Sequence, residues 1–171
     1  QDIQIGGHVW HIITGFGHSP EHASLYCAQQ KLLISGDMVL PRISTNVSVF
    51  AIEPEANPVQ SYLDSLAKYH VLPPDTLVLP AHGKPFRGLH TRITQLNQHH
   101  AARLAEVLEA CRTPQSAADI VPIMFTRVLD AHQLTFAIGE ALAHLHKLWF
   151  DGVLRRSFDN DGIIRFIHVN A

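Results

Sequence analysis

The sequence predicts a mixed α/β fold in which short strands and amphipathic helices succeed one another. Residues 1–35 alternate apolar and polar side chains in the way that half-buried strands do. Several later segments instead repeat apolar residues at helical spacing. With 171 residues and 46% hydrophobic content, the chain can bury a sizeable core as one domain or two small ones.

The first third of the chain is predicted to be extended. Residues 3–13 are typical of a strand pair around a double-glycine turn, and residues 23–34 of a hairpin around two glutamines. The stretch from 39 to 58 contains three prolines. Because proline removes a hydrogen-bond donor and fixes its own backbone angle, we expect no single regular element there.

Two helices and a short strand follow. Pro58 stands at a favoured first helical position, and apolar residues recur at helical spacing as far as Tyr69, before a proline pair ends the helix. Residues 76–79 predict a short buried strand. A long helix then runs from Leu89 to about Cys111, with its polar residues largely on one face.

The last part of the chain predicts a small α+β domain. Thr113 is followed by proline, a pattern typical of a helix N-cap with proline in the first helical position. A short helix, a helix from about Leu134 to Phe150 and a hairpin over residues 153–169 complete the chain. This order is that of a winged helix-turn-helix. We therefore expect three parts, with the bounds 1–88, 89–112 (a connecting helix) and 113–171.

Charge and composition disfavour several kinds of partner. The net charge is −2, and residues 113–171 carry five basic against six acidic side chains, which disfavours a nucleic-acid interface. Arg155 and Arg156 would be its candidate phosphate contacts. No apolar stretch approaches the ~20 residues needed to span a bilayer, so no membrane partner is expected. With only two cysteines, a reducing, cytoplasmic location is the expectation.

Three loops each place a potential metal ligand directly after an apolar run. The ligands are His18, Asp37 and His82, in loops that contain glycine or proline. Imidazole and carboxylate are donors that zinc, iron and manganese accept. Considered singly, each residue is more typical of a structural role, because a turn aspartate commonly hydrogen-bonds its own backbone.

The chain holds thirteen histidines, so chance pairs are expected. Strand alternation and helical geometry separate the members of two such pairs. We interpret six histidines as structural or surface residues: His8, His11, His99, His100, His144 and His146.

Together, the three loops resemble those of the metallo-β-lactamase-fold hydrolases. Residues 14–22 are similar to that superfamily's Thr-Pro-Gly-His-Thr-x-Gly-His segment, with Phe16 in place of proline and Glu21 in place of glycine. Gly36-Asp37 matches its Gly-Asp segment, and residues 79–83 match its Leu-Pro-Gly-His-Gly segment. Residues 40–44, the helix that contains Tyr62 and the stretch from Arg92 to Arg103 are similar to the branch of glyoxalase-II-like hydrolases and lactamase-like nucleases that carry a C-terminal winged helix.

The resemblance implies the C-terminal half of an αββα sandwich followed by the winged-helix-like domain. It implies two divalent metal ions, with zinc favoured and iron and manganese left as alternatives, and with His18 completing the first site, Asp37 bridging both and His82 serving the second. His22 and Ser19 would be supporting residues. The superfamily's His-x-His-x-Asp-His segment does not occur in these 171 residues. The residues therefore identify no catalytic base, and we expect the fragment alone to bind metal weakly and to be inactive.

The expected function is part of a metal-dependent hydrolase that acts on an ester, a thioester or a phosphodiester. A small anionic or thioester substrate is the expected partner, with Arg42 and Lys84 near the metal loops, although no substrate-binding set emerges from the sequence. Two alternatives stay open: a nucleic-acid-processing enzyme that binds through the winged helix, and a non-enzymatic remnant or interaction module. Unpaired strand edges also make a homo-oligomer an expectation.

Overall fold

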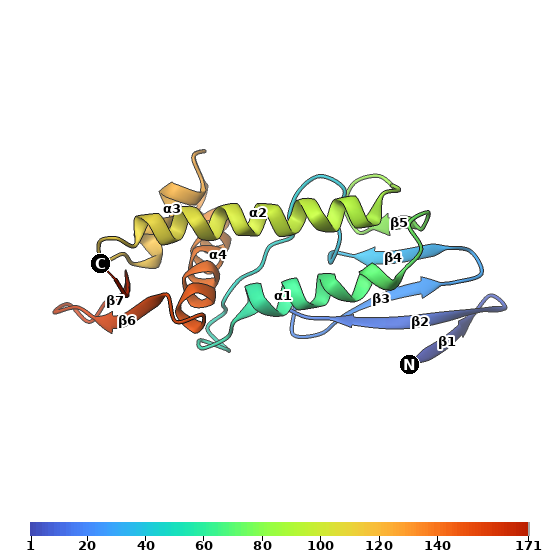
Figure 1. Cartoon of the computed structure of the whole chain (residues 1–171), viewed down its shortest axis with the longest axis horizontal. Helices are drawn as coiled ribbons and strands as arrows, with labels where there is room; N and C mark the ends of the chain where they lie inside the picture. Colours follow the sequence, from blue (N-terminus) through green and yellow to red (C-terminus); the bar gives the residue numbers. More distant parts are fainter. Residues whose placement is uncertain (171) are drawn as a thin grey trace. The chain divides into compact units, whose positions relative to one another are not determined.

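The computed structural model describes residues 1–170 (Figure 1). Its elements are β1 (Asp2–Ile5), β2 (His8–Gly15), β3 (His22–Cys27), β4 (Leu32–Gly36), α1 (Pro58–Ala67), the 3-10 helix η1 (Lys68–Val71), β5 (Leu77–Pro80), α2 (Leu89–Ala110), α3 (Ala117–Met124), α4 (Ala131–Phe150), β6 (Leu154–Phe158) and β7 (Ile164–His168). The chain forms two compact units. The first contains residues 1–45 and 60–98, and the second contains residues 46–59 and the chain from His99 onward.

The first unit is built on a five-stranded sheet with the order β1-β2-β3-β4-β5. The first three pairs are antiparallel: β1–β2 and β3–β4 are the two predicted hairpins, and β2–β3 joins them, whereas β4 and β5 are parallel. A parallel pair needs a crossover between its strands, which α1 and η1 supply here. The carboxyl ends of β4 and β5 consequently lie at the same edge of the sheet.

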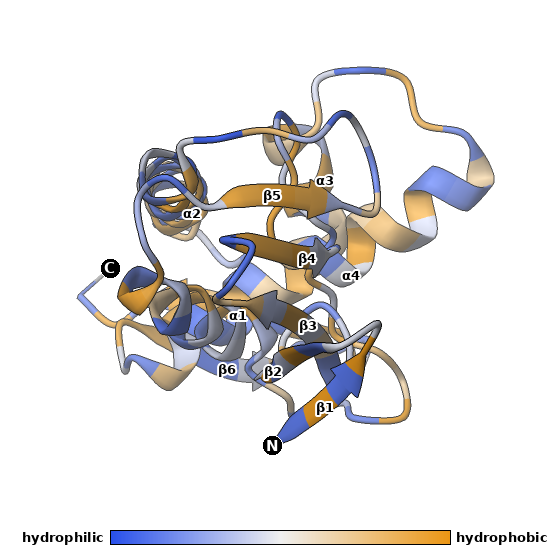
Figure 2. Cartoon of the chain, turned by 90° about the vertical axis from the view of Figure 1, so that its right-hand side faces the viewer, coloured by the Kyte–Doolittle hydropathy of each residue, from blue (hydrophilic) through white to orange (hydrophobic). Residues whose placement is uncertain are grey.

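Helices cover one face of this sheet, and the opposite face is only partly buried. Tyr26, Leu33 and Val78 are paired across β3, β4 and β5 and are buried on one face. On the same face, the Ser24 hydroxyl lies 2.7 Å from the hydroxyl of Tyr69 in η1, so this face is the one that the helices cover. β4 and β5 are hydrophobic along most of their length (Figure 2). On the opposite face Ile34 is 37% exposed.

The second unit contains the end of α2, helices α3 and α4, and the β6–β7 hairpin. Its buried core is apolar and draws on all of these elements; its largest fully buried members are Ile120, Leu145 and Phe166. Residues 46–57, which lie within the stretch 39–58 predicted to be irregular, add a segment along α4. The Val49 amide donates to the Gly139 carbonyl at 3.1 Å, and a Cβ atom on Gly139 would lie 2.9 Å from Ser48.

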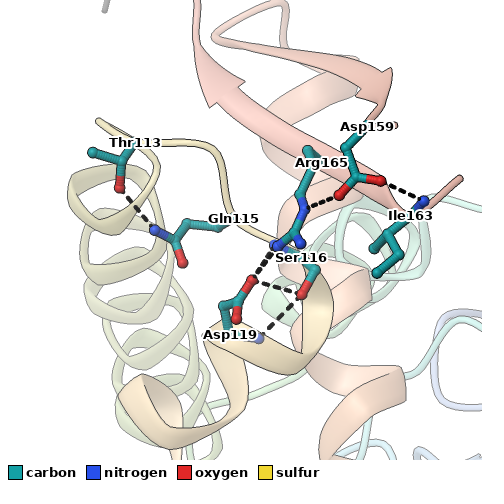
Figure 3. Close-up of polar contacts among 7 residues, drawn as sticks. All are labelled: Thr113, Gln115, Ser116, Asp119, Asp159, Ile163 and Arg165. Atoms are coloured by element: carbon teal, nitrogen blue, oxygen red, sulfur yellow. Dashed lines mark hydrogen bonds and ion pairs between the residues drawn. The ribbon is translucent and has the colours of Figure 1, made fainter. Parts of the chain in front are cut away.

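The start of α3 differs from the prediction. Ser116, not Thr113, is the N-cap: its hydroxyl accepts from the Asp119 amide, and the Asp119 carboxylate accepts from the Ser116 amide (Figure 3). Gln115 is extended instead, because its backbone pairs with that of Phe166 in β7. Because of this tertiary pairing, the helix begins later in the sequence than the proline at position 114 predicted.

Helix α4 also begins earlier than expected. Asp130 caps it in a reciprocal arrangement with Gln133, so the helix starts at Ala131 rather than near Leu134. No helix among residues 1–170 is both long and apolar enough to cross a membrane. Cys27 and Cys111 are both buried and free.

Candidate metal centre

The three predicted ligand loops meet at one edge of the first unit's sheet. His18 lies in the loop that joins β2 to β3, whose pairing at this edge ends at Gly15 and His22. Asp37 directly follows β4, and His82 follows β5 by two residues. Antiparallel pairing of β3 with β4 and parallel pairing of β4 with β5 place all three loops at the same edge.

The Asp37 carboxylate lies between the two histidines. Its Oδ2 atom is 3.7 Å from His18 Nε2, and its Oδ1 atom is 3.5 Å from His82 Nε2. The side chains of His18 and Asp37 are each 27% exposed, whereas that of His82 is 72% exposed. The Asp37 carboxylate thus presents a separate oxygen to each imidazole. The three residues come from loops that are distant in sequence.

His22 supports Asp37 and stands apart from this trio. The Asp37 amide donates to His22 Nε2 at 3.2 Å. The imidazole ring occupies the space over Gly36, where a Cβ atom would approach it to 2.4 Å and where the backbone φ is +53°. Burial, followed by the neighbouring His18, lowers the pKa of His22. A neutral ring can accept the amide hydrogen, so His22 fixes the start of the Asp37 loop.

The orientation of His18 is set from the other side of its ring. The Thr45 hydroxyl lies 3.1 Å from Nδ1 of His18, which leaves Nε2 as the nitrogen that faces Asp37. Contacts of this kind to the second ring nitrogen commonly fix the direction and tautomer of a metal-binding histidine. Thr45 is itself buried.

The loop that follows Asp37 is held by hydrogen bonds to its carbonyl groups. The Tyr62 hydroxyl donates to the Met38 carbonyl at 2.9 Å. The Arg92 guanidinium donates to the carbonyl of Leu40 at 2.6 Å and to that of Ile43 at 2.9 Å. Sequence reasoning missed Tyr62 and Arg92 as supports, because apolar and polar helical periodicity carries no signal for which loop a side chain will reach.

The donor atoms suit a divalent metal, but they form an incomplete set. Two imidazole nitrogens and a carboxylate match the ligand chemistry of zinc, iron and manganese. Within residues 1–170, however, no group of three or more histidine, cysteine, aspartate or glutamate side chains is arranged to hold a metal ion.

The other singled-out histidines have structural surroundings. In the first unit, His8 is partly buried and contacts Gln29, and His11 is exposed and contacts Asp2. His100, His144 and His146 are all buried in the second unit.

Comparison with known proteins gives a consistent family match. The family described as metallo-beta-lactamase superfamily matches residues 1–82, and the one described as metallo-beta-lactamase-like, C-terminal domain, matches residues 104–169. A curated relative from Bacillus subtilis (strain 168), described as a probable metallo-hydrolase, is 26% identical over 145 residues, which cover 81% of this chain and 44% of the relative.

Solved structures agree over almost the whole chain. A beta-lactamase domain protein from Burkholderia ambifaria is 60% identical, with a TM-score of 0.97 over 99% of this chain and 50% of its own. A metallo-beta-lactamase family protein from Thermus thermophilus is 27% identical, with a TM-score of 0.86 over 98% of this chain and 52% of its own. The chain thus spans about half the length of the relatives that it matches.

Proposed function

Because this chain belongs to the metallo-β-lactamase superfamily, we propose that it is part of a metal-dependent hydrolase that acts on an ester, thioester or phosphodiester bond. His18, Asp37 and His82 are the proposed metal ligands. The observation that carries the proposal is the placement of Asp37, whose two carboxylate oxygens each face a different histidine. Zinc is the proposed ion, and iron and manganese are alternatives that the test below distinguishes.

When bound, divalent ions in such a site supply Lewis acidity and an activated water near neutral pH. The chain's own contribution is to position the donors. Asp37 is fixed from behind by His22, and His18 is oriented through Thr45. His82 lies on the more exposed side, where an incoming substrate can approach.

The isolated 171-residue chain is proposed to bind metal weakly and to be inactive. Its three donors cannot complete two metal sites, and a dinuclear centre in this superfamily would draw on a His-x-His-x-Asp-His segment that these residues lack. A non-enzymatic remnant would share this property. The hydrolase and the remnant differ in the parent protein: only for the hydrolase should a parent that carries the segment bind metal and hydrolyse a substrate.

The second unit is proposed to be a winged-helix-like packing module and not a nucleic-acid reader. Two of its arginines already have acidic partners: Arg156 donates to the Glu55 carboxylate at 2.9 and 3.0 Å, and Arg165 lies between Asp119 and Asp159 (Figure 3). Guanidinium groups that are engaged in this way must lose a partner before they can bind phosphate. Strong phosphate binding by Arg156 or Arg165 is therefore not favoured.

The decisive experiment compares the 171-residue chain with a full-length parent protein. Metal content is measured by mass spectrometry after dialysis, and hydrolysis is assayed on ester, thioester and phosphodiester substrates. We expect stoichiometric metal and hydrolysis in the parent and neither in the fragment. Tight stoichiometric metal in the fragment would refute its proposed incompleteness, and a metal-free, inactive parent would refute the hydrolase.

A matched pair of variants then tests Asp37 in the parent protein. Asp37→Asn should lower metal affinity by at least ~10-fold, because an amide lacks the carboxylate charge at a shared ligand position. Asp64→Asn is the control, since Asp64 is exposed on α1 and its carboxylate accepts a hydrogen bond from Gln60. Equal metal content in the two variants would remove Asp37 from the ligand set.

A further inference from the structure

A cavity of about 600 Å³ lies in the first unit beside His82. Two loops form its walls: residues 41–43 from the loop after Asp37, and residues 82–86 from the loop after β5. We call it the 41–86 cavity. Its volume falls within the ~300–1,000 Å³ typical of small-molecule sites, and one of its lining residues, His82, is a proposed metal ligand.

The charge in the 41–86 cavity has one sign. Arg42 and Lys84 line it, and no aspartate or glutamate does. Within residues 1–170, no hydrogen bond or ion pair occupies either side chain. Elsewhere in the same unit Lys31 is paired, at 2.7 Å, with Asp75. Two cations without acidic partners, one on each wall, are available to an anion.

The remaining lining of the 41–86 cavity is largely apolar. Pro41 and Ile43 lie on one wall, and Pro85 and Phe86 lie on the other. Ile43 is 64% exposed, so its side chain is accessible to a ligand in the cavity. A ligand that pairs an anionic group with a hydrocarbon portion would cover this apolar surface while it neutralises the two cations.

Both walls are held in place before any ligand arrives. Gly83 packs so closely on Pro41 that a Cβ atom would lie 2.7 Å from the proline ring. The backbone of Phe86 pairs with that of Val78 in β5 at 2.8 and 3.0 Å, and Arg92 holds the Ile43 carbonyl. A preformed cavity lowers the ordering cost of binding.

We propose that the 41–86 cavity binds an anionic group of the substrate through Arg42 and Lys84. The substrate class is then an ester or thioester that carries a carboxylate or phosphate on an apolar spacer. Water adds across the scissile C–O or C–S bond, which gives a carboxylic acid and an alcohol or thiol. The assignment rests on the proposed hydrolase function, because it takes His82 as the link between the cavity and the reacting bond.

Binding is tested without turnover on the chelator-treated 171-residue chain, so that no metal can hold the anion. The probes are 3-phenylpropionate, phenyl phosphate and the neutral 3-phenylpropanamide, titrated by calorimetry or NMR. The two anions should bind at least ~10-fold more tightly than the amide, and the tighter of them identifies the anionic group. Arg42→Gln and Lys84→Gln should each cost roughly 10-fold, as loss of a charge-assisted hydrogen bond does.

Arg112→Gln is the matched control, because Arg112 is an exposed surface arginine in the second unit, paired with Glu109. It should bind the probes like the unaltered chain. Equal affinity for the amide and the anions, or an equal loss in all three variants, would overturn the proposal.

An activity measurement separates this proposal from the hydrolase proposal. The metal-loaded parent is given the phenylpropionyl thioesters of 3-mercaptopropionate and of 3-mercaptopropanamide. The cavity assignment is supported if kcat/KM is higher for the anionic thioester than for the neutral one and if Lys84→Gln abolishes this difference. Equal kcat/KM values refute the cavity while the hydrolase stands. A parent that cleaves neither these thioesters nor the ester and phosphodiester substrates refutes the hydrolase, and the binding titrations then decide whether the cavity is an anion site.

Discussion

Gly83 lies where the loop after β5 passes closest to the loop after β4. Its φ is +91°, and a Cβ atom would meet the Pro41 ring at 2.7 and 3.3 Å. Gly88 has a similar φ of +88° but nothing within 4 Å of a Cβ atom. The two glycines therefore share a backbone conformation that other residues adopt only with strain, and they differ in what a Cβ atom would contact.

This pair yields a stability prediction for the 171-residue chain. Gly88→Ala should cost about 1 kcal/mol through positive φ alone. Gly83→Ala should cost about 1–3 kcal/mol more, because a rigid proline ring cannot move aside easily. Urea denaturation followed by circular dichroism measures both, and equal losses would show that the Pro41 contact is soft.

At the level of single residues, the sequence identified His18, Asp37 and His82 as candidate ligands, because each follows a strand on a loop that contains glycine or proline. It could not reveal the backbone bond from Asp37 to His22 or the fit of that ring over Gly36. Those contacts depend on the register between β3 and β4, which only the folded sheet fixes.

Helices α1 and α2 act on the candidate centre through the loop that they hold. Arg92, in the first turn of α2, donates to the carbonyls of Leu40 and Ile43. Burial lowers the pKa of its guanidinium, although the group stays charged at neutral pH. Its planar fork can serve two carbonyls at once, which an ammonium group does less well.

We therefore expect Arg92→Met to destabilise the chain by about 1.5–3 kcal/mol, the range for hydrogen bonds to charged groups. Methionine keeps part of the apolar stem and removes both donors. Arg112→Met is the control, since its exposed ion pair should contribute less than about 1 kcal/mol. Urea unfolding of both variants decides: similar losses would mean that the loop does not depend on Arg92.

The boundaries of the helices show where tertiary contacts override the local sequence pattern. The helical periodicity predicted α1, α2 and α4, and the turn residues predicted both hairpins of the first unit. The cap at Thr113 was wrong because Gln115 pairs with Phe166, a partner 51 residues away in sequence. The Asp130–Gln133 capping box, by contrast, is a local signal that could have placed the start of α4 correctly.

For the whole molecule, the stretch 46–59 was the least predictable part. The prolines of the stretch 39–58 correctly predicted that no regular element precedes α1, but they could not show that residues 46–59 belong to the second unit. Its anchors are single contacts, such as the Ala56 carbonyl, which accepts from His146 Nδ1 at 2.9 Å. The same packing buries His144 and His146 together, although they lie on different sides of α4.

The buried His100–His144 pair makes the second unit sensitive to acid. His144 Nδ1 donates to the Glu140 carbonyl at 2.8 Å, so its neutral ring accepts at Nε2, where His100 Nδ1 donates at 3.3 Å. Burial lowers the pKa of His100 to about 3 and that of His144 to about 4. Burial also raises the pKa of Glu140 to about 7.

The sign of each contribution follows from proton binding. Below the ordinary histidine pKa of 6.5, the unfolded chain binds protons that folded His100 and His144 exclude, so stability falls as the pH drops toward 4. Glu140 acts oppositely: between its ordinary pKa of 4.5 and about 7 the folded state holds an extra proton. Each group contributes about 1.4 kcal/mol per pH unit within its window.

Between pH 5 and pH 6, at ~1.4 kcal/mol per group and pH unit, His144→Gln should therefore flatten the pH dependence of unfolding free energy, and Glu140→Gln should steepen it by a similar amount. Urea unfolding is followed by the fluorescence of Trp149 in a Trp10→Phe background, so that the signal reports the second unit. The comparison uses slopes, which a uniform loss of stability leaves unchanged. If both variants kept the pH slope of the unaltered His144 and Glu140 chain, water would reach these groups in the folded state and their burial would not control acid stability.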